Sequence, residues 1–270
     1  QKTGSFKARG VLTKLDSLSE EEKQRGVISI SAGNHAQALA WGCAREGIDC
    51  LLITWRDASP LKVAATRGYG ATVDQEASDH LKAFERVEAL RRESGRTLVH
   101  PFDDPFVVAG QGTVGLEIGE DLTEVDVVVV PVGGGGLVSG IATALPGKRI
   151  VAVEPEGSAA LSMAVKAGQP VTFAPQSIAD ALNAPVAGHL PLEICSKLGV
   201  ESVLVTDEEI EVGFRFLYER TKLAVEPGAA AGAAALLAGN VAEVEGKTVA
   251  VVVSGGNVAT QIAAAILRGE

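Results

Sequence analysis

Short apolar segments rich in β-branched residues alternate with longer segments of helical spacing along almost the whole chain. The apolar segments predict seven strands, at 26–31, 50–54, 97–100, 125–132, 149–154, 202–206 and 248–254. Several of them are apolar at consecutive positions, which is typical of strands buried on both faces of a parallel sheet. The segments of helical spacing predict six helices, at 34–46, 59–68, 80–94, 137–144, 207–221 and 229–237. This alternation predicts an α/β fold with mostly parallel sheets.

Three predicted strands end in polar, glycine-containing segments, at 31–35, 133–136 and 254–257. In an open α/β sheet, ligands bind outside the carboxyl ends of the strands. These three segments are therefore the first places to look for a binding site.

The four glycines at 133–136 lie between a predicted strand and a predicted helix. Without Cβ atoms, several backbone N–H groups can converge on one anion at a helix N-terminus, which suits a phosphate group. A flexible turn is the simpler alternative. A dinucleotide-binding unit is another, because Glu154 follows about 20 residues later, but Val138 or Ser139 stands where G-x-G-x-x-G requires its third glycine.

The other two segments and one lysine have both structural and functional interpretations. Residues 31–35 offer hydroxyl, amide and backbone donors that could bind a carboxylate. In the simpler interpretation, Ser31 or Asn34 caps the next helix. Ser254 hydrogen-bonds a ligand or caps the last helix. Lys7, at the start of a predicted helix, is an ordinary surface lysine unless it is buried, in which case its pKa falls and its amine becomes a nucleophile.

Composition narrows the range of partners. The chain has 270 residues, of which 46% are hydrophobic and 21% charged, and a net charge of −10, so its field repels nucleic acids and anionic membranes. It has three cysteines and no C-x-x-C motif, which indicates neither a disulfide framework nor a zinc site and favours a reducing cytoplasm. No apolar run is long enough to predict a membrane span. Because the chain begins with Gln1 directly in a motif, we expect an N-terminal segment to be missing.

Several motifs occur together, and their order along the chain is specific: TGSFKARG at 3–10, SAGNHAQ at 31–37, HPFDDP at 100–105, AGQGT at 109–113, GGGGL at 133–137, VEP at 225–227 and SGGN at 254–257. In this combination the chain resembles the fold-type II pyridoxal-phosphate enzymes, in the branch of the serine/threonine dehydratases and serine racemases. The resemblance implies an α/β fold with two open, mostly parallel sheets flanked by helices. It implies a small domain at 27–105 inserted into a large cofactor-binding domain at 1–26 and 106–270.

The resemblance also implies roles for individual residues. Lys7 is the Schiff-base lysine and the base that takes the Cα proton, Phe6 packs against the pyridine ring, and Asn34 hydrogen-bonds its 3-oxygen. Ser254 meets the pyridine nitrogen. The other residues that it places around pyridoxal phosphate are Gly133, Gly134, Gly135, Gly136, Leu137 and Glu226. The loop that binds the substrate carboxylate consists of Ser31, Ala32, Gly33, Asn34 and His35.

The implied activity is β-elimination of L-threonine or L-serine, which yields a 2-oxo acid and ammonia. The SFKAR string favours the dehydratases over the cysteine synthase branch of the same fold. Phe102 favours the dehydratases over the racemases, and Ala32 stands where racemases carry a serine able to protonate Cα. Other β-hydroxy amino acids, such as 3-hydroxyaspartate or phenylserine, remain alternatives, because Ala181 replaces a common glycine. A nicotinamide-dependent oxidoreductase is a remote alternative that leaves Lys7 without a role.

A cation site is the weakest part of the resemblance. Glu154 and Ser158 match two of its ligands, but Ala160 replaces the aspartate, so a strong Mg²⁺ or Ca²⁺ site is not expected. The expected partners are a small β-hydroxy amino acid and further copies of the same chain, in a homodimer or a larger homo-oligomer.

Overall fold

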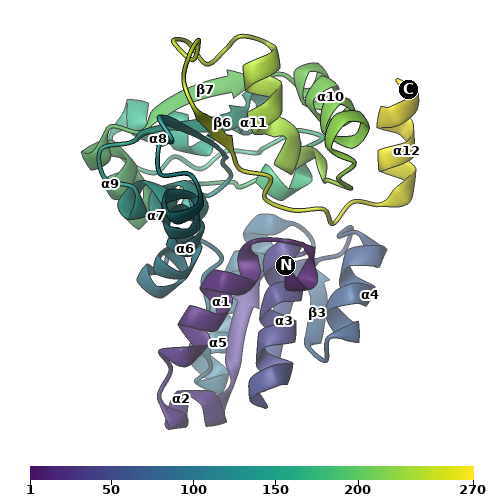
Figure 1. Cartoon of the computed structure of the whole chain (residues 1–270). Helices are drawn as coiled ribbons and strands as arrows, with labels where there is room; N and C mark the ends of the chain where they lie inside the picture. Colours follow the sequence, from purple (N-terminus) through teal and green to yellow (C-terminus); the bar gives the residue numbers. More distant parts are fainter. The chain divides into compact units, whose positions relative to one another are not determined.

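The computed structural model describes the backbone of residues 1–270 and all side chains except those of His80 and Leu81. The chain forms two compact units, Gln1–Gly110 and Gln111–Glu270, each built around its own four-stranded parallel sheet (Figure 1). No helix in the part of the chain that the structure describes is long and apolar enough to cross a membrane.

The sheet of the first unit has the strand order β3-β2-β1-β4. Its strands are β1 (Val27–Ile30), β2 (Cys50–Trp55), β3 (Thr72–Ala77) and β4 (Thr97–Leu98). Its helices are α1 (Lys7–Asp16), α2 (Glu20–Arg25), α3 (Asn34–Glu46), α4 (Pro60–Gly68), α5 (His80–Ser94) and the first part of α6 (Pro105–Asp121).

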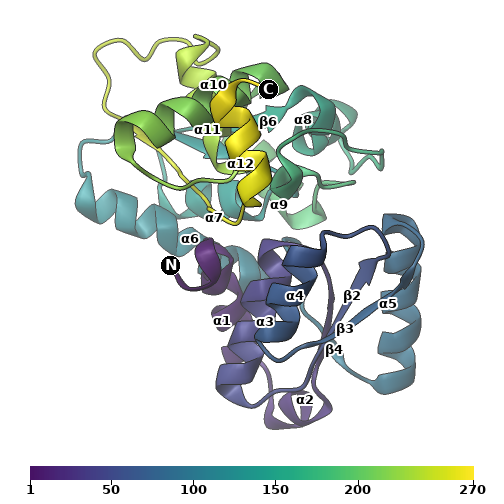
Figure 2. The same cartoon turned by 90° about the vertical axis from the view of Figure 1, so that its right-hand side faces the viewer.

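Alternating side chains of β1 bury the two faces of this sheet against different helices. Val27 packs in a cluster with Val11 and Leu15 of α1 and with residues of α3. Ile28 packs in a second cluster with Val87 of α5. The helices α3 and α4 therefore lie on one side of the strands and α5 on the other, as Figure 2 shows.

The sheet of the second unit has the strand order β7-β6-β5-β8. Its strands are β5 (Val127–Pro131), β6 (Arg149–Pro155), β7 (Glu201–Val205) and β8 (Val249–Val251). Its further helices are α7 (Gly136–Ala144), α8 (Ala160–Ala167), α9 (His189–Leu198), α10 (Asp207–Phe216), α11 (Pro227–Leu237) and α12 (Thr260–Arg268). A short π-helical segment, Leu217–Thr221, extends α10.

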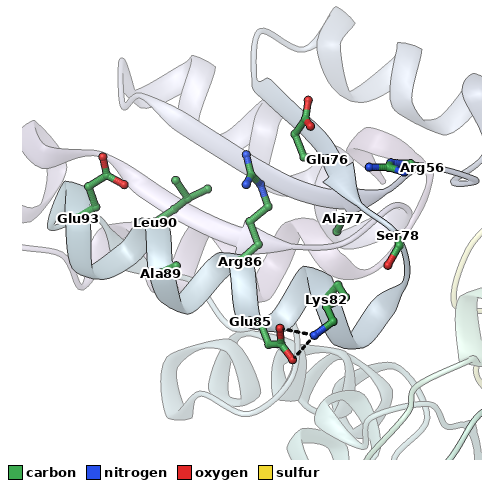
Figure 3. Close-up of a pocket in the computed structure, with 10 residues that line it drawn as sticks. All are labelled: Arg56, Glu76, Ala77, Ser78, Lys82, Glu85, Arg86, Ala89, Leu90 and Glu93. Carbon is green, nitrogen blue, oxygen red and sulfur yellow. Dashed lines mark hydrogen bonds and ion pairs between the residues drawn. The ribbon is translucent and has the colours of Figure 1, made fainter.

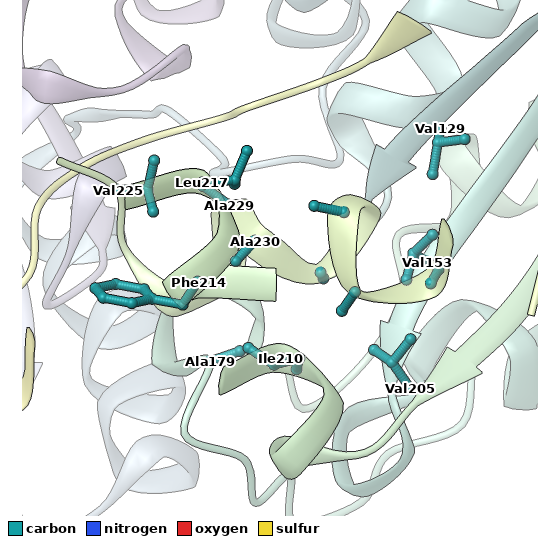
Figure 4. Close-up of a cluster of buried hydrophobic side chains, with 14 of the residues drawn as sticks. Val129, Val153, Ala179, Val205, Ile210, Phe214, Leu217, Val225, Ala229 and Ala230 are labelled. Carbon is teal, nitrogen blue, oxygen red and sulfur yellow. The ribbon is translucent and has the colours of Figure 1, made fainter. Parts of the chain in front are cut away.

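The main core of this unit lies between the sheet and α10, α11 and α12. Val129 and Val153 of the sheet pack there with Phe214 of α10 and with the alanines of α11 (Figure 4). Small residues let the two helices approach closely, because a Cβ at Gly213 would lie 2.8 Å from the carbonyl oxygen of Ala230. The core of this unit therefore depends on backbone contact as well as on large side chains.

The structure confirms the α/β class and the two open parallel sheets. It divides the chain at Gly110, so that residues 1–26 lie in the first unit, whereas the sequence assigned them to the large domain. The physical reason for this division is that Val11 and Leu15 are fully buried against α3. Four further helices, α2, α6, α8 and α9, and the strand β3 were not predicted.

Candidate active site

Lys7 is the first residue of α1 and follows a tight turn. In this turn Thr3 and Gly4 both have left-handed backbone conformations, with φ of 62° and 72°. A threonine in this region is uncommon, because its branched side chain crowds the backbone. The turn leads directly into α1, with Phe6 as its N-cap.

The amine of Lys7 is held inside the first unit. Its Nζ donates a hydrogen bond to the carbonyl oxygen of Pro101 at 2.6 Å and lies 5.2 Å from the centroid of the Phe6 ring. Burial lowers the pKa of Lys7 to about 8, because the surrounding protein disfavours the charged form. The structure thus gives Lys7 the partner and the desolvation that a nucleophilic lysine requires.

Residues 31–35 connect β1 to α3, next to the segment that follows β4. Gly33 is the N-cap of α3, and no described side chain caps this helix. The hydroxyl of Ser31 accepts a hydrogen bond from the Gly33 N–H at 3.1 Å, so it shapes the loop and does not cap the helix. The capping interpretation is therefore wrong, and the N-terminus of α3 has the positive end of a helix dipole, which favours an anion such as a carboxylate. Asn34 is the first residue of α3.

His35 belongs to a buried cluster that the sequence did not reveal. The Ser29 hydroxyl donates to the carbonyl oxygen of Val99 at 2.6 Å, and the His35 Nε2 lies 3.0 Å from that hydroxyl and 3.2 Å from the same carbonyl oxygen. Burial, with the charge of Lys7, lowers the pKa of His35 well below its ordinary value. A neutral His35 with its Nε2 facing an acceptor ties the 31–35 loop to the end of β4.

Pro101, which accepts the hydrogen bond from Lys7, also lies just after β4. Val99 and Pro101 flank His100, whose Nδ1 accepts hydrogen bonds from the N–H groups of Phe102 and Asp103 at 3.3 and 2.8 Å. Burial also lowers the pKa of His100. Nothing in the sequence indicated these hydrogen-bonding roles of Ser29, inside β1, and of His100, just after β4.

In the second unit, the glycines 133–136 follow β5 and lead into α7. Gly135 is the N-cap with a φ of 93°, and a Cβ there would lie 2.7 Å from the Cβ of Pro191. A Cβ at Gly133 would lie 3.0 Å from the carbonyl oxygen of Leu182. Glycine is therefore required at both positions, which is not expected of a merely flexible turn.

These glycines fit a phosphate group. No described side chain caps α7, so the N–H groups of its first turn are available, and the absence of Cβ atoms lets an anion approach the backbone. Leu137, in this first turn, is buried. The residues present thus suit the phosphate of pyridoxal phosphate.

Ser254 lies beyond β8 at the same edge of the sheet. The register pairs Val129 with Val251, and its continuation places Ser254 beside Val132, next to the glycines. The last helix begins only at Thr260, so Ser254 does not cap it. The buried Glu226 precedes α11, and its N–H donates to the carbonyl oxygen of Gly255 at 3.1 Å. Ser254 therefore belongs to the loop that follows β8, and Glu226 is hydrogen-bonded to that loop.

Glu154 and Ser158 are both fully buried in the second unit. The Glu154 carboxylate accepts hydrogen bonds from the N–H groups of Leu161 and Ser162 at 2.7 and 2.9 Å and from the Ser202 hydroxyl at 3.2 Å. It caps α8 from the neighbouring strand, and burial raises its pKa. These bonds tie the Glu154 carboxylate to the N-terminus of α8 and to Ser202 of β7, which is a structural role for a buried glutamate.

A surface hollow lies elsewhere in the first unit, between β3 and α5 (Figure 3). Its lining is mainly charged, with Arg56, Glu76, Arg86 and the Lys82–Glu85 ion pair. None of the predicted site residues lines it. The hollow is therefore separate from the residues described above.

Comparisons with known proteins agree with this geometry. A family model described as "Pyridoxal-phosphate dependent enzyme" matches residues 1–255. An L-threonine ammonia-lyase of Thermotoga maritima is 42% identical over 96% of this chain and 65% of its own length. The chain thus spans less than two thirds of that relative. A catabolic L-threonine dehydratase of Staphylococcus aureus, TdcB, is 41% identical over 100% of this chain and 80% of its own length.

A solved structure has the same fold. The structure of maize serine racemase superimposes with a TM-score of 0.91 at 33% sequence identity, covering 96% of this chain and 82% of that chain. The likeness therefore includes relatives of both the dehydratase and the racemase type.

Proposed function

The chain belongs to the family of pyridoxal-phosphate dependent enzymes, and on that premise we propose that it is an ammonia-lyase acting on L-threonine or L-serine. The reaction breaks the bond between Cβ and its hydroxyl group and releases a 2-oxo acid and ammonia. The relatives named as threonine ammonia-lyase and threonine dehydratase support this choice. The observation that carries it is the desolvated amine of Lys7 beside Pro101.

Lys7 has two roles in the proposal. Its amine would hold the cofactor covalently, and in its free form this amine would take the proton from Cα of the substrate. A pKa of about 8 leaves a useful fraction of this amine unprotonated near neutral pH. Pro101's carbonyl oxygen accepts a hydrogen bond from Nζ and so orients the amine.

Pyridoxal phosphate supplies an electron sink for the negative charge that develops at Cα. The glycines 133–136 and the first turn of α7 bind its phosphate through backbone N–H groups. By the resemblance, Phe6 would pack against the ring, Asn34 would hydrogen-bond the ring oxygen, and Ser254 would meet the ring nitrogen. Because a hydroxyl group is neutral, Ser254 does not favour protonation of that nitrogen as a carboxylate would. Such a moderate sink suits prompt loss of the β-hydroxyl group.

The substrate carboxylate binds at residues 31–35, where the uncapped N–H groups of α3 and the Ser31 hydroxyl are located. The neutral His35 adds no charge there, so recognition relies on the helix N-terminus and on hydrogen bonds. This arrangement supports a small monocarboxylic amino acid more than a dicarboxylic one.

Racemisation is the second candidate, because maize serine racemase has the same fold. It requires a group that delivers a proton to the opposite face of Cα. Ala32 stands in the 31–35 loop and has no proton to transfer. We therefore propose that elimination predominates over racemisation.

One experiment tests the reaction and its lysine together. The protein loaded with pyridoxal phosphate is mixed with L-threonine or L-serine, while 2-oxo acid and D-serine are measured in parallel. We expect 2-oxo acid from the unaltered protein and none from Lys7→Ala. Full turnover by Lys7→Ala contradicts the role of Lys7, and D-serine in amounts comparable with pyruvate contradicts the choice of a lyase.

We also propose that the chain works in the cytoplasm as a homodimer or larger oligomer. The three cysteines are buried and free, which suits a reducing compartment. Light scattering of the purified protein measures the assembly, and a monomeric mass contradicts this part of the proposal.

A further inference from the structure

We term glycines 133–136 the glycine loop. Residues 176–191, which we term the backing segment, pack against this loop. Three contacts join them. A Cβ at Gly133 would lie 3.0 Å from the Leu182 carbonyl oxygen, and a Cβ at Gly135 would lie 2.7 Å from the Cβ of Pro191. The N–H of Gly188 donates to the carbonyl oxygen of Gly134 at 3.1 Å. The backing segment therefore fixes the side of the loop that faces away from an anion.

The backing segment has little regular structure of its own ahead of α9, since it contains only a short 3₁₀ turn, Asp180–Leu182. Near the glycines, the hydroxyl of Ser158 donates to the Leu182 carbonyl oxygen at 2.9 Å. Ser158 is fully buried and lies at the end of a turn between β6 and α8. It thus connects the rigid part of the sheet to the residue that packs against Gly133.

A second anchor lies nearer the beginning of the backing segment. The Asp207 carboxylate accepts hydrogen bonds from the Ser177 hydroxyl and from the Ile178 N–H at 2.5 and 3.1 Å. These bonds secure the beginning of the segment, four or more residues before Leu182. Ser158 therefore acts directly on the part that contacts the glycine loop.

We infer that Ser158 is a positioning residue for the cofactor phosphate, acting through Leu182 on Gly133. This inference rests on the proposed function only in assigning the phosphate to glycines 133–136. The N–H groups of the loop must converge on one anion, and hydrogen bonds weaken steeply when their geometry is disturbed. Without the Ser158 hydroxyl, the Leu182 carbonyl keeps the bond from the Ala184 N–H at 2.8 Å, which belongs to the same stretch of backbone and fixes nothing to the sheet.

The test compares two cofactor forms that differ only in the phosphate. Ser158→Ala and the unaltered protein are stripped of cofactor, and the dissociation constants of pyridoxal 5'-phosphate and of pyridoxal are measured by absorbance titration. Loss of one buried hydrogen bond that orders the loop predicts about a fivefold weaker affinity for pyridoxal phosphate. The affinity for pyridoxal stays unchanged, because pyridoxal makes no use of the loop.

The matched control is Ser162→Ala, which removes another serine hydroxyl from the second unit, at the Glu154 carboxylate and outside the backing segment. It lowers stability without changing the preference for the phosphorylated cofactor. Ser158→Cys keeps the volume and a weak donor and gives an intermediate affinity, so the test survives if the alanine variant does not fold.

Equal losses of affinity for both cofactor forms overturn the inference, because they indicate general destabilisation. So does an unchanged affinity for pyridoxal phosphate in both Ser158 variants. Failure of the proposed function has a different signature. In that case the unaltered protein releases no 2-oxo acid from threonine or serine, yet the selective loss of phosphate binding in Ser158→Ala still appears.

Discussion

Replacing Lys7 by methionine is expected to abolish activity and yet to stabilise the cofactor-free protein at pH 7. The pKa of Lys7 falls from 10.5 to about 8 because the folded protein disfavours the ammonium form. At about 1.4 kcal/mol per pKa unit, this shift costs the fold about 3 kcal/mol at pH 7. Methionine avoids that cost but leaves the Pro101 carbonyl oxygen without its hydrogen bond, at about 1 kcal/mol. The net gain is about 2 kcal/mol.

The sign of the pH dependence makes this prediction specific. Between the folded and unfolded pKa values of Lys7, the unfolded chain binds more protons, so the stability contributed by the unaltered lysine rises with pH. Its cost shrinks to about 1.4 kcal/mol at pH 9.5, and the advantage of Lys7→Met falls to about 0.4 kcal/mol. At pH values well below 8 the lysine is almost fully protonated in both states, and the advantage approaches a constant value.

Urea unfolding of both cofactor-free proteins at pH 7 and pH 9.5 measures these differences. The control is Lys82→Met, because Lys82 is an exposed residue whose ion pair with Glu85 has little effect on stability. If Lys7→Met is no more stable than the unaltered protein at pH 7, or if its advantage is the same at both pH values, Lys7 is not desolvated as described.

Three other predictions concern binding, pH and reaction type. Gly135→Ala should weaken pyridoxal-phosphate binding more than tenfold in equilibrium dialysis, because the added Cβ would clash with Pro191. The control is Gly168→Ala, which also has a positive φ, of 70°, but no neighbouring atoms around its Cβ, so it should affect only stability. Plots of kcat against pH should fall about tenfold per unit below pH 8, because the Lys7 amine is free to take a proton only once substrate is bound. They should show no inflection near 6.5, because burial lowers the pKa values of His35 and His100, and a histidine inflection would contradict their neutral state. Ala32→Ser should increase D-serine formation in chiral chromatography, and an unchanged product ratio would show that position 32 does not face Cα.

The elements that the sequence predicted well are those whose pattern reflects burial. The strand β5 is apolar at every position, and α3 begins directly after a glycine, so pattern and boundary signals agree. The strand β3, Thr-Val-Asp-Gln-Glu-Ala, was missed because it forms the edge of its sheet and leaves several positions exposed. The helix α6 was missed because its glycines and β-branched residues have low helix propensity, which tertiary contacts override.

The candidate site was only partly visible in the sequence. Motif order predicts roles for Lys7 and the glycines 133–136, because each motif alone is ambiguous and only their combination is specific. The roles of Ser29 and Pro101 arise from a hydroxyl group and a backbone carbonyl brought close by folding, and neither has a sequence signature. The sequence also could not show that the Glu154 carboxylate accepts hydrogen bonds from the N-terminus of α8.

The helix α11, with its run of alanine and glycine residues, limits how this enzyme can be altered by directed evolution. Nine of its eleven residues are buried, and at Gly232 a Cβ would lie 3.1 Å from Val251. Because nearly any change there adds volume to a filled space, random libraries lose many members to misfolding before substrate preference is tested. A library that spares α11 and Gly213 and varies the 31–35 loop will hold a larger share of folded variants.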